Sequence, residues 1–168
     1  MKKNLIVVAL LALASLSFAQ IQFNSKDLNG TAVTNEIFSK NKVTMLNIWG
    51  TFCGPCIKEM PDLAKLSEIN KSKGVEIVGI PIDLTDKNGN IKSKQKKDAD
   101  TIIAGTGANY THIVPSKEMM NGLLKNIQAV PTTIFVDKNG NQIGDVYMGA
   151  RSLQDWQKII DEILAKQN

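Results

Sequence analysis

The chain has 168 residues, 43% of them hydrophobic and 21% charged, with a formal net charge of +4. These values are typical of one globular domain and exclude a disordered, collagen-like or coiled-coil protein. The two cysteines, Cys53 and Cys56, are too few for a scaffold of several disulfides or a four-cysteine zinc site.

Residues 1–19 have the pattern of an export signal. Lys2 and Lys3 precede an apolar run from Leu5 to Ala14, and Ser17 and Ala19 place small residues before a cleavage site. We expect cleavage to leave the domain 20–168 in a periplasmic or other extracytoplasmic compartment. The alternative is a retained anchor, although the apolar run is shorter than the roughly 18–20 residues that span a bilayer.

Removal of residues 1–19 would take away two lysines and no acidic residue, which lowers the net charge to +2. The lysine-rich stretch 92–97 has no interleaved aromatic residue, and Asp98 and Asp100 follow it directly. Nucleic acid is therefore not an expected partner.

The apolar patterns predict an α/β domain with elements in the order strand–helix–strand, an inserted helical stretch, then strand–strand–helix. In the first half of the chain we expect a hairpin within 20–44 around Asn29-Gly30, a strand over 43–49, a helix from Pro55 to Gly74 kinked at Pro61, and a strand over 75–82. The inserted stretch should be an exposed loop over 83–99 running into a short helix over 100–108, followed by a helix capped by Ser116. The chain should then end with strands over 132–136 and 142–148 and a last helix capped by Ser152.

The two cysteines lie where the first of these longer strands ends and a helix begins. Backbone N–H groups and the positive end of the helix dipole would point at the sulfur of Cys53 and favour its thiolate. Cys56, almost one turn further on, would be more buried and able to form a disulfide with Cys53. We therefore expect Cys53 to attack a substrate disulfide and Cys56 to resolve the mixed disulfide.

The segment Trp-Gly-Thr-Phe-Cys-Gly-Pro-Cys over 49–56, with Pro61 and Val130-Pro131-Thr132 further on, resembles the exported TlpA/ResA-like thiol-disulfide oxidoreductases of the thioredoxin superfamily. The resemblance implies a thioredoxin-like fold: a central mixed β-sheet flanked by helices, with an N-terminal β-hairpin and a helical insertion. It also implies that Pro131 is cis and faces the dithiol. By the same resemblance, substrate would be bound by residues on both sides of the dithiol: Trp49, Phe52, Gly54, Pro55, Val130 and Pro131.

Two positions depart from the thioredoxin pattern. Asn47 replaces the buried Asp of cytoplasmic thioredoxins and cannot take up a proton, whereas Glu59 lies three residues beyond Cys56 and could do so. A solvated helix glutamate is the alternative interpretation of Glu59. Phe52 stands where many relatives have Trp, which keeps an apolar face and removes an indole donor.

Gly54 and Pro55 offer no histidine to stabilise a thiolate, and His112, the one histidine, is remote in sequence. We therefore expect a reductase without cofactor or metal. The family resemblance implies a monomer recharged by a membrane thiol-electron transporter, with clients such as apocytochrome c or methionine sulfoxide reductases. The insertion between residues 83 and 116 is the expected place for client choice.

Other classes of protein fit the two thiols less well. A Cu(I) metallochaperone could use both thiolates, although Met119 and Met120 are far along the chain and a cis Pro131 over the sulfurs would obstruct a metal. A thiol peroxidase would need Thr where the chain has Gly50, and a non-enzymatic interaction module would make the cysteines incidental.

Overall fold

The structure, a computed structural model, describes residues 20–167, so the predicted export signal lies outside the described residues. Its elements are β1 (Asn24–Lys26), β2 (Ala32–Thr34), the 3-10 helix η1 (Asn35–Lys40), β3 (Val43–Trp49), α1 (Gly54–Lys71), β4 (Val75–Pro81), α2 (Ser93–Thr106), β5 (Thr111–His112), α3 (Lys117–Asn121), β6 (Thr132–Asp137), β7 (Gln142–Met148) and α4 (Leu153–Ala165). Within this part of the chain, no helix combines the length and the apolar character needed to cross a membrane.

A mixed five-stranded sheet forms the centre of the fold, in the order β5-β4-β3-β6-β7. The strands β3, β4 and β5 run parallel, while β6 and β7 add antiparallel. The hairpin β1–β2 forms a separate two-stranded sheet. The predicted fold class is confirmed, including the N-terminal hairpin and the insertion between the two halves.

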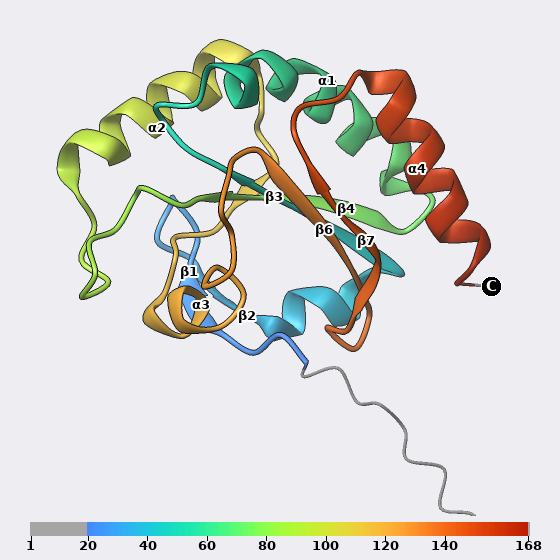
Figure 1. Ribbon diagram of the computed structural model, residues 1–168, viewed down its shortest axis with the longest axis horizontal. Helices are drawn as coiled ribbons and strands as arrows, with labels where there is room; N and C mark the ends of the chain where they lie inside the picture. Colours follow the sequence, from blue (N-terminus) through green and yellow to red (C-terminus); the bar gives the residue numbers. More distant parts are fainter. Residues whose placement is uncertain (1–19, 168) are drawn as a thin grey trace, which may run out of the picture.

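Both faces of the sheet are covered, which explains why β3 and β4 are apolar almost throughout. Figure 1 shows α1, α2 and α4 along one face, with the hairpin, η1 and α3 on the other. The face under α1 and α4 is filled by large side chains, among them Met45, Leu63, Phe135, Trp156 and Ile160. The opposite face is filled by Phe23, Phe38, Leu46, Ile48, Val78 and Ile134, among others.

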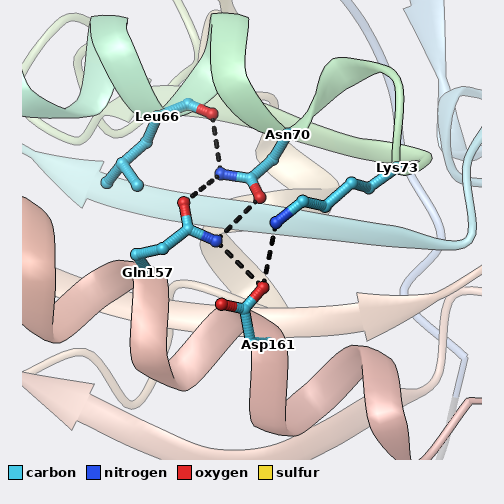
Figure 2. A network of polar contacts seen from close by, with 5 residues as sticks. All are labelled: Leu66, Asn70, Lys73, Gln157 and Asp161. Atoms are coloured by element: carbon cyan, nitrogen blue, oxygen red, sulfur yellow. Dashed lines mark hydrogen bonds and ion pairs between the residues drawn. The ribbon is translucent and has the colours of Figure 1, made fainter.

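A polar network, here called the helix clamp, joins the end of α1 to α4 (Figure 2). The fully buried Asn70 donates to the carbonyl of Leu66 and exchanges two hydrogen bonds with Gln157, at 2.8 and 3.0 Å. Gln157 also donates to Asp161, which accepts from Lys73 as well. The clamp fixes α4 against the helix that carries both cysteines.

The structure corrects the predicted organisation of the insertion. One helix, α2, spans Ser93–Thr106. It therefore begins inside the segment 83–99 predicted to be an exposed loop, well before the predicted start of the helix over 100–108. The first two turns are lysine-rich and lack an apolar stripe. They are nevertheless helical because Ala99, Ile102 and Ile103 further along pack beside the dithiol, with Lys-to-Asp pairs on the exposed side.

Candidate active site

Cys53 and Cys56 form a disulfide at the beginning of α1. Cys53 is the N-cap of the helix, and its sulfur accepts the backbone N–H of Cys56 at 3.2 Å. This N–H is one of the unpaired donors of the first turn, and the same donor would stabilise a thiolate on Cys53 after reduction. Cys56 is 1% exposed and Cys53 5%, so Cys56 is the more buried of the two, as predicted.

The loop between β3 and α1 is anchored on both sides. The carboxylate of Asp83, just after β4, accepts from the backbone N–H and from the hydroxyl of Thr51, at 3.0 and 2.5 Å. The ring of Phe52 lies back over Gly50, where a Cβ would come within 2.7 Å of it. The loop therefore presents Cys53 from a fixed backbone, and residue 50 must be glycine for the ring to lie there.

The segment before β6 faces the disulfide from the other side. The Val130–Pro131 peptide bond is cis, which confirms the expectation for Pro131. The carbonyl oxygen of Val130 lies 3.6 Å from the sulfur of Cys53. The carbonyl of Pro131 accepts from the N–H of Gly149 at 2.8 Å, which ties this segment to the end of β7.

Glu59, three residues after Cys56 on α1, is buried and only 4% exposed, so the alternative of a solvated helix glutamate is wrong. Its oxygens accept from the side chain of Asn47 at 3.1 Å, the backbone N–H of Arg151 at 3.1 Å and the indole of Trp156 at 3.3 Å. Burial raises the pKa of Glu59 above its ordinary value, and these three donors only partly oppose that rise.

Arg151 is held in place by its aromatic neighbours. Its guanidinium lies 5.2 Å from the ring centre of Tyr147 and 5.0 Å from that of Trp156, and it donates to the carbonyls of Met148 and Gly149. The backbone N–H that reaches Glu59 is thereby held in a fixed position.

The structure places the predicted substrate-binding residues in two groups. Gly54 and Pro55 are exposed at the start of α1, Phe52 is 71% exposed, and Val130 is half-buried beside the disulfide. Pro131 is buried. Trp49 is buried more completely: its side chain has no exposed surface, so it is not part of the exposed face formed by Phe52, Gly54 and Pro55. It packs under the disulfide in a core group that we call the dithiol cluster, made up of Trp49, Cys53, Cys56, Met60, Leu84, Ala99, Ala108 and Val114.

A groove of about 630 Å³ adjoins the exposed end of α1. It lies between the start of α1 and the start of α4, and the residues at each of these helix starts contribute charged side chains to its lining. Its lining residues are Gly54, Pro55, Lys58, Glu59, Asp62, Ala150, Arg151, Ser152 and Asp155. The groove is therefore lined by the edge of Glu59 together with the exposed Gly54 and Pro55.

Sequence reasoning missed four residues that support the site: Asp83, His112, Arg151 and Trp156. Each contacts the region of the dithiol from a distant part of the chain, and none belongs to a local motif. The contact between Trp156 and Glu59, for example, spans 97 residues.

Comparison with known proteins places this geometry in a family. The family model Redoxin matches residues 17–156. The chain belongs to the Redoxin family. The thiol-disulfide oxidoreductase ResA of Oceanobacillus iheyensis is 30% identical over 132 residues, which cover 77% of this chain and 61% of ResA. ResA of Bacillus thuringiensis subsp. konkukian is 34% identical over 124 residues, covering 71% and 62% of the two chains.

The chain thus spans about six-tenths of the length of these relatives. Solved structures agree with the thioredoxin-like fold. A thioredoxin-family thiol:disulfide interchange protein of Chlorobium tepidum superposes with a TM-score of 0.69 at 25% identity, covering 85% of this chain and 93% of its own. StoA of Bacillus subtilis superposes with a TM-score of 0.63 at 20% identity, covering 83% and 96%.

Proposed function

We propose that this member of the Redoxin family is an extracytoplasmic thiol-disulfide oxidoreductase that reduces disulfides in client proteins through Cys53 and Cys56. The observation that carries the proposal is a disulfide at a helix N-terminus, with the backbone of Val130 and the cis Pro131 beside it. The names of the ResA relatives support the reaction class.

The reaction begins from the reduced dithiol. The thiolate of Cys53 attacks one sulfur of a client disulfide, so that a mixed disulfide forms and the other client sulfur leaves as a thiolate. The thiolate of Cys56 then attacks the sulfur of Cys53, which releases the second client sulfur and forms the disulfide that the structure contains. Two electrons pass to the client, and a dithiol reductant must return them.

Cys56 must lose its proton before it attacks, and Glu59 is the group we assign to receive it. Glu59 lies on α1, three residues after Cys56 and therefore on the same face. Its raised pKa brings it closer to that of a thiol than an exposed carboxylate would be. Asn47, Arg151 and Trp156 hold the carboxylate in one orientation for both directions of transfer.

We assign the reducing direction because no side chain between the two cysteines adds to the stabilisation that the start of α1 gives the thiolate. Gly54 and Pro55 carry no donor side chain, and His112 is occupied in the interior. Strong oxidants in this superfamily reach about −120 mV by such stabilisation, against about −270 mV for thioredoxin. The proposed source of electrons is a membrane thiol transporter, and the proposed clients are apocytochrome c or methionine sulfoxide reductases.

The predicted export signal over residues 1–19 supports the proposed extracytoplasmic location, in which we propose that the reductase acts as a monomer. The client would lie across the exposed face formed by Phe52, Gly54 and Pro55, with its backbone beside Val130. The exposed ring of Phe52 supplies an apolar contact beside the reacting sulfur.

Trapping with the variant Cys56→Ala tests the proposal. Cys53 would form the mixed disulfide but have no partner to resolve it, so a client should accumulate in a covalent complex that mass spectrometry identifies. Cys53→Ala is the matched control and should trap nothing. Recovery of an oxidase and its folding substrates would contradict the reductase assignment.

The same preparation separates the reductase from a Cu(I) metallochaperone. The reductase should catalyse insulin reduction by dithiothreitol and retain no copper after purification of the reduced protein. One equivalent of bound Cu(I) without reductase activity would favour the chaperone.

A further inference from the structure

The single histidine of the sequence is buried at the edge of the sheet and takes no part in the exchange steps above. His112 lies in β5 and is 4% exposed. Its Nε2 is 2.9 Å from the carbonyl oxygen of Ala108, and its Nδ1 is 3.3 Å from the indole nitrogen of Trp49. A carbonyl only accepts, so Nε2 carries the proton, and Nδ1 accepts the hydrogen bond of the indole.

The surroundings of this imidazole fix its position. The ring of Tyr110 stacks on it at 4.6 Å between centres, and the indole of Trp49 meets it edge-on at 5.6 Å. On the remaining side lies Gly79 of β4, where a Cβ would come within 2.1 Å of Nδ1. The space is therefore open to this ring only because residue 79 is glycine.

Trp49 connects this position to the dithiol. It is the last residue of β3, four positions before Cys53, and its indole packs in the dithiol cluster with both cysteines. Its carbonyl accepts from the N–H of Ile82 at 2.8 Å. With the backbone and the indole both held, the direction in which the chain leaves β3 is set.

His112 also connects to two elements outside the minimal sheet. Its carbonyl accepts from the backbone N–H of Leu28 in the N-terminal hairpin, at 3.0 Å. Ala108, the partner of Nε2, lies just after α2 in the insertion. The hairpin therefore meets His112 through its backbone, and the insertion and the end of β3 meet it through its ring.

We propose that His112 is a positioning residue of the dithiol: by accepting the indole hydrogen bond of Trp49, it fixes the loop that presents Cys53 and so favours the thiolate. This inference rests on the proposed function, because it assigns His112 to the same thiol chemistry. Burial lowers the pKa of His112 to about 4, so the ring stays neutral and able to accept at neutral pH.

Three substitutions of His112 separate its two hydrogen bonds. In His112→Asn the amide oxygen can take the place of Nδ1 and keep the acceptor for Trp49. In His112→Gln the amide nitrogen can take the place of Nε2 and keep only the donor to Ala108, and His112→Phe keeps neither. The measurements are the indole ¹H–¹⁵N resonance of Trp49 and the pH dependence of Cys53 alkylation in the reduced protein. The indole of Trp156 serves as an internal control.

We expect His112→Gln and His112→Phe to move the Trp49 resonance upfield, leave that of Trp156 in place and slow alkylation of Cys53 at neutral pH about three- to tenfold, because less thiolate is present. His112→Asn should stay within about twofold of the parent protein. Equal behaviour of the Asn and Gln variants, or an unchanged alkylation profile in all three, would overturn the proposal and leave His112 a purely structural residue.

A measurement on the unaltered chain keeps the proposal testable if a variant does not fold. The long-range ¹H–¹⁵N spectrum of the single histidine should show the neutral tautomer protonated at Nε2, and protonation at Nδ1 would overturn the proposal. Failure of the proposed function is distinguishable: the parent protein would then fail to reduce client disulfides while the Trp49 and alkylation pattern persisted.

Discussion

The helix clamp predicts a specific loss of stability in Asn70→Ala. The substitution removes three hydrogen bonds, one to Leu66 and two exchanged with Gln157, from a side chain with no exposed surface. At about 1 kcal/mol for each bond, and with Gln157 able to regain water, the free energy of unfolding should fall by about 2–3 kcal/mol. For a domain of this size the melting temperature should drop by roughly 5–10 °C.

Urea and thermal unfolding of the oxidised protein measure this loss with the disulfide held constant. Lys73→Ala is the matched control, because it removes only the exposed ion pair to Asp161 and should cost less than about 1 kcal/mol. The double variant Asn70→Leu with Gln157→Leu should be more stable than Asn70→Ala, since both amides are removed together and neither is left without the other. A loss below about 0.5 kcal/mol in Asn70→Ala, or one equal to that of Lys73→Ala, would refute the reasoning.

Three further predictions concern pH and the loop before Cys53. The pKa of His112 is about 4 in the folded protein and about 6.5 when unfolded, so the free energy of unfolding should fall by up to about 3 kcal/mol as the pH drops through this window. Urea unfolding of the parent protein and of His112→Phe at several pH values isolates this effect, and a difference in unfolding free energy that does not change with pH would contradict it. The raised pKa of Glu59 has the opposite effect: the stability contributed by the protonated carboxyl is complete below the unfolded pKa and is lost as the pH rises through the folded pKa. Over that pH range the parent protein should lose stability relative to Glu59→Gln, and the pH–rate profiles of the two proteins for thiol exchange should differ. Asp83→Ala should leave Thr51 without its two hydrogen bonds and slow alkylation of Cys53, whereas an unchanged rate would show that this anchor does not control the thiolate.

The junction that carries the chemistry could be predicted from the sequence because its signals are local. An apolar run predicted β3, the Cys-Gly-Pro-Cys spacing placed two sulfurs within one turn, and Asn29-Gly30 predicted the hairpin β1–β2, all of which the structure confirms. These features depend on neighbours within a few residues, so a single sequence contains the information they need.

The insertion and the surroundings of the dithiol could not be predicted in this way. The first turns of α2 have no apolar stripe, and the two-residue strand β5 exists only because β4 offers it an edge. The burial of Glu59 depends on donors more than 90 residues away, in Arg151 and Trp156. The role of His112 depends on the absence of a side chain at Gly79 in another strand. Only the tertiary structure brings these groups together.

The proposed chemistry requires the N-terminus of α1 to hold the sulfur of Cys53 as a thiolate after reduction. Titration of Cys53 in reduced Cys56→Ala, followed by thiolate absorbance, measures this directly. We expect a pKa of Cys53 between about 3.5 and 7.5. An ordinary value near about 8.5, together with no disulfide reduction by the intact pair, would contradict it.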